Sequence, residues 1–334
     1  MRKKYIIQVL IYFVIGLGCK KDVTNNDWKQ IKIDYTGYLS DIDFTDNANG
    51  YIVGDYDFNL ARTILLKTVD GGETWQIDTF RVNKVKFFGI YADAAGTLYA
   101  SGNSLDTRLI SRDRIYKSID KGQSWSLIDT LHTLNSQTFH LFNPNEGILV
   151  FSQSFFATND SGNNFSKVYE SQKGFSTFNH LQFVNNKVGY ATGGISYDIT
   201  DYGIIAKSID GGKSWTNKDI NISNITGSFF IDSAIGYIFT FSRQLYKTTD
   251  GGESWNLINT NVPAQYTRCY FKSETEGYIA DLNRIHYTND GGKTWLLKLT
   301  VNSSDINGIT GLCFTKANSG FVIGREGQIL KLSN

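Results

Sequence analysis

The chain has 334 residues, of which 41% are hydrophobic and 19% charged, and its formal net charge is +1. This composition excludes an intrinsically disordered chain, and the near-zero charge argues against a nucleic-acid binder that works by neutralising phosphates. Aromatic residues reach 14%, and 32 glycines stand against 2 prolines, which indicates short strands joined by tight turns.

Residues 1–18 have the pattern of an export signal. Basic residues at positions 2–4 precede an apolar run over 5–18, which is too short for a comfortable membrane span and typical of a signal-peptide core. The run ends in small residues before Cys19, which resembles the lipobox of bacterial lipoproteins, except that Gly16 stands where that motif has Leu. We predict a signal peptide over 1–18, lipidation of Cys19, a polar tether over 19–26 and a place in the bacterial cell envelope. The alternative is an ordinary signal peptide that ends at a cysteine.

One octamer, Ser/Thr-x-Asp-x-Gly-x-Thr/Ser-Trp, recurs six times. Its aspartates are 50, 40, 50, 40 and 40 residues apart, a period typical of a four-stranded propeller blade. We expect the Asp to accept hydrogen bonds from its own turn and the glycines to take backbone angles that side chains disfavour. The aspartates are Asp70, Asp120, Asp160, Asp210, Asp250 and Asp290; Trp75, Trp125, Trp215, Trp255 and Trp295 end five copies, and Phe165 ends the third, degenerate copy.

A second element precedes each octamer, namely a Gly followed by a short apolar strand. Six residues before each Gly stands an apolar side chain, and we interpret these side chains as one buried layer. The glycines are Gly50, Gly96, Gly147, Gly189, Gly236, Gly277 and Gly320, and the apolar residues are Phe44, Ile90, Leu141, Phe183, Phe230, Phe271 and Phe314.

The repeat is therefore read as four strands, a to d, with the Gly at the start of b and the octamer between c and d. The seventh copy stops after its c strand, whereas Trp28–Ile31 resembles the start of a d strand. The sequence predicts an all-β fold over residues 27–334: a seven-bladed β-propeller of four-stranded antiparallel blades, closed by the N-terminal strand completing the last blade.

Extra length between strands b and c is expected in blades 1, 2 and 4, as enlarged loops over 54–63, 102–114 and 193–203. Surplus loop length on a rigid scaffold is where function concentrates. Arginine forms planar contacts with carboxylates, so we predict that this end binds an acidic or tyrosine-rich protein surface or a polar glycan. Solvated loops with scattered charge are the alternative. The candidate residues are Arg62, Arg108, Arg112, Arg114, Arg243, Arg284, Arg325, Tyr56, Tyr197 and Tyr202.

Signs of catalysis or cofactor binding are missing from the sequence. The four histidines lack metal-type spacing, and no phosphate loop, dinucleotide fingerprint or nucleophile elbow occurs. The Asp55–Asp57 stretch lacks the Gly and Glu of a helix-loop-helix calcium site. We expect no cofactor, no metal, no nucleic-acid partner and a monomer. Cys269 and Cys313 are expected to be free, buried thiols that point to opposite faces of equivalent strands.

The octamer matches the Asp-box, or bacterial neuraminidase repeat, and the chain resembles the Asp-box propellers over Trp28–Asn334. The blade text is similar to that of the photosystem II assembly and stability factor family, and sortilin-like propellers share the box. The first resemblance implies a non-enzymatic protein with an arginine-rich face that binds membrane-protein partners. Its photosynthetic role is not carried over.

Sialidases and xyloglucanases share the box but differ at their catalytic motifs. Neither Pro144 nor Pro263 follows the Arg-Ile of a sialidase motif, and a single ring lacks the second wall of the endo-glucanase cleft. We predict a non-enzymatic, membrane-anchored lipoprotein that serves as a protein-binding or assembly scaffold. The alternatives are a glycan-binding surface protein that uses the candidate tyrosines, and an Asp-box glycoside hydrolase that uses carboxylates such as Asp55.

Overall fold

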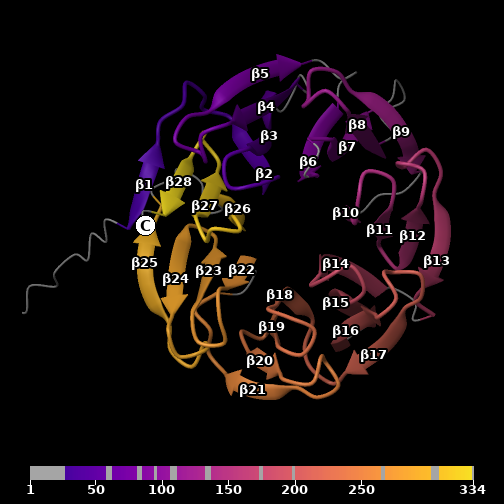
Figure 1. Ribbon diagram of the computed structural model, residues 1–334. Helices are drawn as coiled ribbons and strands as arrows, with labels where there is room; N and C mark the ends of the chain where they lie inside the picture. Colours follow the sequence, from indigo (N-terminus) through magenta and orange to yellow (C-terminus); the bar gives the residue numbers. More distant parts are fainter. Residues whose placement is uncertain are drawn as a thin grey trace, which may run out of the picture.

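The computed structural model describes residues 27–57, 62–80, 85–93, 96–105, 111–131, 137–172, 176–197, 200–264, 268–301 and 308–332. Seven four-stranded antiparallel sheets surround a common axis (Figure 1), which confirms the predicted propeller. Residues 1–26, with the predicted signal peptide, Cys19 and the tether, lie outside the described residues. No helix able to cross a membrane occurs in the part of the chain that is described.

The blades follow the chain, and each runs from its innermost to its outermost strand. Blade 1 is β2 (Tyr38–Phe44), β3 (Gly50–Asp57), β4 (Arg62–Thr68) and β5 (Gln76–Phe80); blade 2 is β6 (Val85–Ala92), β7 (Leu98–Leu105), β8 (Ser111–Ser118) and β9 (Ser126–Leu131); blade 3 is β10 (Gln137–Leu141), β11 (Gly147–Phe151), β12 (Ser154–Thr158) and β13 (Ser166–Glu170). Blade 4 is β14 (Ser176–Phe183), β15 (Gly189–Tyr197), β16 (Thr200–Ser208) and β17 (Thr216–Ile220); blade 5 is β18 (Ile225–Phe230), β19 (Gly236–Thr240), β20 (Leu245–Thr248) and β21 (Asn256–Asn259); blade 6 is β22 (Arg268–Phe271), β23 (Gly277–Asp281), β24 (Arg284–Thr288) and β25 (Leu296–Thr300). Blade 7 is β26 (Ile309–Phe314), β27 (Gly320–Gly324), β28 (Ile329–Leu332) and β1 (Trp28–Ile31).

The ring closes as predicted, because the first strand completes the sheet formed by the last three. Trp28 pairs with Leu332 and Ile31 with Ile329 in an antiparallel register. Ile31 is 5% exposed and belongs to a core cluster that joins blade 7 to blade 1 through Phe321 and Trp75. The N-terminal strand therefore completes the sheet of blade 7 and also stabilises the contact between blades 7 and 1.

The glycine that opens strand b is explained by the apolar residue paired with it. A Cβ atom on Gly50 would lie 2.5 Å from the Phe44 ring, and one on Gly236 would lie 2.3 Å from the Phe230 ring. Blade 2 corrects the alignment proposed from sequence. There the register pairs Ala92 with Leu98, so Gly96 lies in the preceding turn with φ of +85°. Ile90 is buried, but it stands two residues before Ala92, which occupies the layer position. The small Ala92 leaves the space that Leu98 occupies.

The Asp-box turn has the hydrogen bonds expected of it. In blade 1, Thr74 donates to Asp70 through its backbone N at 3.0 Å and its hydroxyl at 2.6 Å, and Thr68 donates at 2.7 Å. The Thr74 hydroxyl bond is the largest cause that lowers the pKa of Asp70 to about 2. In the degenerate copy Asn164 supplies the same two donors to Asp160. Both glycines of the first box have positive φ, +71° and +79°.

Neighbouring blades are joined by a recurring cross-strand pair, which we call the Tyr–Lys pair. In blade 4, Tyr190 pairs with Lys207, and they donate to backbone oxygens of blade 5 at Ser233 and Gly251, both at 2.8 Å. The ammonium lies 5.6 Å from the tyrosine ring centroid. Similar pairs occur as Tyr99 with Lys117, as Tyr237 with Lys247 and, with Phe for Tyr, as Phe321 with Lys331. Lys247 differs in that it donates to the Glu274 carboxylate instead of a backbone oxygen.

Polar side chains also satisfy the unpaired edges of the innermost strands, which face the channel. Asp41 and Asp43 of β2 accept hydrogen bonds from the backbone N of Ile90 at 2.9 Å and of Ala92 at 2.8 Å in blade 2. In the same way, Gln182 of blade 4 bonds both backbone groups of Phe230 in blade 5. Desolvation raises the pKa of Asp43 to about 7 and that of Asp41 to about 6, against the opposing effect of these backbone donors.

The two cysteines are free, as predicted, but both are only partly buried. The register places Cys269 opposite Ile279 and Cys313 opposite Phe321, which are adjacent positions of the repeat and therefore alternate in face.

Shortening Ile31 tests the closure. We expect Ile31→Ala to lower the free energy of unfolding by about 2–4 kcal/mol, because it removes a buried side chain shared by the last and first blades. Lys29→Ala changes an exposed residue of the same strand and should cost under about 1 kcal/mol. The measurement is urea unfolding followed by tryptophan fluorescence; equal midpoints for the two variants would contradict this role of β1.

The channel carboxylates predict a pH dependence. Because the folded-state pKa of Asp43 lies above its unfolded value, the folded protein binds more protons, and stability falls as pH rises toward and through about 7. We expect the thermal midpoint to fall between pH 5 and pH 8 and Asp43→Asn to flatten that slope. Asp46→Asn is the matched control, since hydrogen bonds lower the pKa of that exposed carboxyl, and its slope in this window should be unchanged. A slope unaltered by Asp43→Asn would refute the assignment.

Candidate partner-binding face

The loops divide between the two ends of the ring. At one end, the Asp-box turns of blades 1, 3, 4, 5 and 6 are bonded to the a–b loop of their own blade, as Gly71 N to Ala48 O at 2.8 Å. At the other, the d–a connections bond to the b–c turns, as Val262 N to Arg243 O at 2.9 Å and Val301 N to Asn283 O at 2.7 Å. The second end, which we call the b–c face, is the one on which the sequence placed the candidate residues.

The three enlarged loops expected on this face are instead hairpins. In blade 4 the ladder between β15 and β16 continues through Gly194–Gly203 to Tyr197–Thr200, and in blade 2 it continues to Leu105–Ser111. In blade 1 the ladder ends at the Asp57–Arg62 pair. Strands b and c thus extend beyond the blade, because regular pairing satisfies the backbone groups that a loop would leave to water.

The described candidate arginines lie on two parts of this face. Arg243, Arg284 and Arg325 occupy or border the b–c turns of three consecutive blades, 5, 6 and 7. Arg243 and Arg284 are exposed, and the Nε of Arg243 donates to Val262 O at 2.9 Å. Arg325 is partly buried, with its guanidinium 5.2 Å from the ring centroid of Tyr38. Arg114 is in blade 2, opposite Gly102, and its buried Nε has no hydrogen-bond partner among the described residues.

The other candidates are less well placed. Tyr202 of β16 is 38% exposed. Arg62, Arg112, Tyr56 and Tyr197 fall within strands, but their side chains lie outside the described part, as does the whole of Arg108.

Arg268 was missed from the sequence and belongs with this group. It is the first residue of β22, reached from the d–a connection that opens on the same face. Its side chain is exposed to solvent, and the neighbouring protein atoms partly desolvate the guanidinium and lower its pKa, against the opposing effect of the Asp41 charge in blade 1. Its positive charge also helps to lower the pKa of His180 in blade 4, so it projects toward the channel. We call Tyr38, Arg243, Arg268, Arg284 and Arg325 the mouth cluster.

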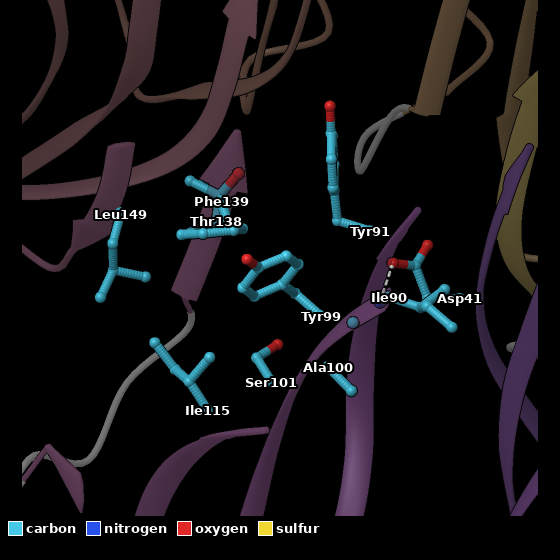
Figure 2. A pocket seen from close by; sticks show the side chains of 11 residues that line it. Asp41, Ile90, Tyr91, Tyr99, Ala100, Ser101, Ile115, Thr138, Phe139 and Leu149 are labelled. Carbon is cyan, nitrogen blue, oxygen red and sulfur yellow. Dashed lines mark hydrogen bonds between the residues drawn. The ribbon is translucent and has the colours of Figure 1, made fainter. Parts of the chain in front are cut away.

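A small cavity lies in the channel wall between described residues of blades 2 and 3. It measures about 120 Å³ and lies between β6 and β10, with Asp41 bonded to Ile90 at one side and Tyr99 near its middle (Figure 2). The hydroxyl of Tyr91 donates to Leu141 O at 2.9 Å. Small-molecule sites typically reach about 300–1,000 Å³, so this space is too small for one.

A larger cleft, of about 690 Å³, lies at the Asp-box end between blades 3 and 4. It exists because blade 3 lacks the Tyr–Lys pair and has Ile148 opposite Ala157 instead. Its carboxylates are already engaged: Glu146 accepts from Asn143 at 2.8 Å, and Asp210 accepts from its own turn. Asp55, a candidate for hydrolysis on the other face, is paired with Lys86 at 2.9 Å. No group of three or more His, Cys, Asp or Glu suited to a metal occurs among the described residues.

Comparisons with known proteins agree with the fold and the repeat. Residues 20–129 match a family described as photosynthesis system II assembly factor YCF48. A photosystem II assembly lipoprotein Ycf48 of Prochlorococcus marinus is 31% identical over 81 residues, which is 22% of this chain and 22% of that protein. The matched segment thus spans about a fifth of the relative's length.

Two solved structures share the architecture. One, described as YCF48 bound to D1 peptide, superposes with a TM-score of 0.70 at 18% identity and covers 92% of this chain and 97% of that one. A GH74 xyloglucanase from Xanthomonas campestris reaches 0.54 at 10% identity, over 88% of this chain and 59% of that one. At these identities both show the fold alone. The chain is an Asp-box β-propeller similar to the photosystem II assembly factors, in sequence over its N-terminal third and in fold over nearly its whole length.

Proposed function

We propose that this protein is a non-enzymatic, membrane-anchored scaffold that binds a segment of a protein partner at the mouth cluster. The observation that carries the proposal is the gathering of four arginines and Tyr38 at one end of the channel, contributed by blades 1, 5, 6 and 7. A guanidinium presents a planar set of donors suited to carboxylates, and arginine and tyrosine are favoured at interfaces.

The mouth cluster favours an extended acidic segment over a small ligand. Arg243 and Arg284 are exposed on neighbouring blades, while Arg268 projects toward the channel and Arg325 lies against Tyr38. Cations spread over several blades fit a chain that crosses the channel mouth. The description of a similar fold as YCF48 bound to D1 peptide supports the use of this scaffold for peptides.

A non-enzymatic role is supported by the state of the described carboxylates. Asp55 forms an ion pair with Lys86, and the channel pair Asp41 and Asp43 is held by backbone donors of blade 2. Hydrolysis of a glycoside needs two carboxyl groups that flank the bond, one of them free to act as base or nucleophile. The engaged carboxylates do not offer that arrangement.

The membrane anchor rests on Cys19. The residues before it resemble a lipobox, and the Prochlorococcus marinus relative is named an assembly lipoprotein. We propose that acyl chains on Cys19 hold the propeller at a membrane of the cell envelope through the tether over residues 19–26.

Charge reversal tests the binding site. We expect Arg284→Glu and Arg268→Glu each to weaken binding of a synthetic acidic peptide rich in Glu and Tyr by about tenfold, or about 1.4 kcal/mol, because each replaces an attractive charge with a repulsive one. Fluorescence anisotropy at low and moderate salt gives the Kd. Lys213→Glu reverses an exposed charge at the Asp-box end and should change the Kd by less than about twofold. Equal losses in all three variants would show only a general effect of net charge.

Turnover assays separate the scaffold from a hydrolase. We expect no hydrolysis of a panel of chromogenic glycosides by the purified protein. Hydrolysis that disappears in Asp55→Asn while glycan binding persists would overturn the non-enzymatic assignment, and glycan binding lost on Tyr202→Ala without any peptide binding would favour a glycan receptor.

A further inference from the structure

The described chain begins at the Asp-box end of the ring. β1 is an outermost strand, equivalent to β5, and outermost strands start directly after the Asp-box turn. Side chains hold this point: Lys298 of blade 6 lies 3.2 Å from the carboxylate of Asp27, and Lys29 lies 3.1 Å from Glu73, which belongs to the Asp-box turn of blade 1. The described chain therefore starts on the face opposite the mouth cluster, and Cys19 stands eight residues before that point in the sequence.

The tips of three Asp-box turns on this face carry bare aliphatic side chains. Val69, Ile119 and Ile209 occupy the position before the Asp in blades 1, 2 and 4, and they are 77%, 80% and 70% exposed. They are the most exposed large hydrophobic residues in the described part of the chain. The same position holds Asn159, Thr249 and Asn289 in the other boxes, so the turn does not require an apolar residue there.

Lysines on the same turns balance the acidic charge there, which includes the Asp-box aspartate of each turn. Glu73 is neutralised by Lys29 and Lys331, and Glu253 by Lys218. By contrast, Lys121, Lys213 and Lys293 project from the turns of blades 2, 4 and 6, where they are exposed and form no ion pair with the described residues. Exposed aliphatic tips with lysine side chains beside them suit the boundary between acyl chains and lipid headgroups.

The length of the tether holds this face close to its anchor. Cys19 and Asp27 are eight residues apart, so the span between them is at most about 28 Å even when fully extended. We infer that the Asp-box end docks on the lipid bilayer through Val69, Ile119 and Ile209, which points the mouth cluster away from the membrane. This inference rests on the lipid anchor proposed above, and it adds an orientation that the anchor alone does not impose.

Depth-dependent quenching tests the orientation in the full-length, lipidated protein. The protein is reconstituted into vesicles of phosphatidylcholine and phosphatidylglycerol, with an environment-sensitive fluorophore on Lys121→Cys or, at the opposite face, on Ser242→Cys. Burial raises the pKa of the Cys269 and Cys313 thiols, so these native cysteines react slowly. We expect nitroxide-labelled lipids to quench the fluorophore at position 121 at least threefold more than that at 242.

Replacing the tips isolates their contribution. We expect Val69→Thr, Ile119→Thr and Ile209→Thr together to reduce the quenching at position 121 at least threefold while the acyl chains keep the protein in the vesicle fraction. Threonine is accepted at this place in blade 5, so the fold is preserved. The matched control is Phe88→Thr, which removes an exposed apolar residue from the middle of the innermost strand β6 and should leave the quenching unchanged.

Three results would overturn the inference: equal quenching at the two faces, quenching indifferent to the tip substitutions, or a mass spectrum without acyl chains on Cys19. The function proposed for the mouth cluster is tested separately, because the acidic-peptide Kd should be unchanged in the threonine variant. Loss of peptide binding in Arg284→Glu should likewise leave the quenching at position 121 intact.

Discussion

β1, with Trp28 at its start, pairs with the last strand of the chain and so completes both a sheet and a ring. An open fan of seven sheets would leave one face of the first blade and one face of the last in water, together with the unpaired edge of β28. The pairing of Ile31 with Ile329 removes that edge and brings Phe321 against the aromatic residues of blade 1. Once the first and last strands are paired, the other contacts between neighbouring blades can all use similar side-chain interactions.

That chemistry combines apolar packing with a small set of directed polar bonds. The Tyr–Lys pair binds backbone oxygens on the next blade near its Asp-box end, whereas Asp41, Asp43 and Gln182 bind backbone groups along the channel. Each inner strand has an edge with no neighbouring strand, and its N–H and C=O groups would otherwise depend on channel water. Desolvation raises the pKa of Asp43 to about 7, and the backbone donors that face it offset this rise only in part, so Asp43 is uncharged at mildly acidic pH.

Much of the fold could be predicted because each repeat contains the same short-range sequence patterns, and each pattern determines a local structure. The Asp-box bonds follow from one side chain and its own turn, and Gly50 and Phe44 are related by a fixed spacing. The alignment of blade 2 was predicted wrongly because Ala92 is small and removes the contact that makes glycine necessary at the start of strand b. Leu98 therefore occupies that position, and Gly96 lies in the turn before the strand. The long hairpins were predicted as loops because the amino-acid sequence of a polar strand resembles that of a polar loop. The strand that pairs with it distinguishes the two, and this partner is visible only in the structure.

The candidate site was predicted only in part, for a related reason. Arg243, Arg284 and Arg325 recur at similar places in the repeat, and this made them visible. Arg268 is the first residue of an inner strand, and its charge interacts with that of Asp41, which is on another blade and far away in the sequence. The sequence alone does not reveal that these two residues are neighbours. Asp41 and Asp43 likewise act on residues 49 positions away, through a contact that the closed ring creates.

A closed ring has no free end, so a change of its diameter must be absorbed at one or more of the seams between blades. Six seams have a tyrosine or phenylalanine on strand b facing a lysine or a second tyrosine on strand c, but the seam after blade 3 has Ile148 and Ala157. The Asp-box ends of blades 3 and 4 are separated by the cleft of about 690 Å³. Nearer the axis, the ring of His140 stacks on that of Phe183, with their centroids 4.8 Å apart. This seam is therefore packed near the axis and open at its Asp-box end, so it has fewer contacts to resist a change of diameter than a seam that is filled along its whole length.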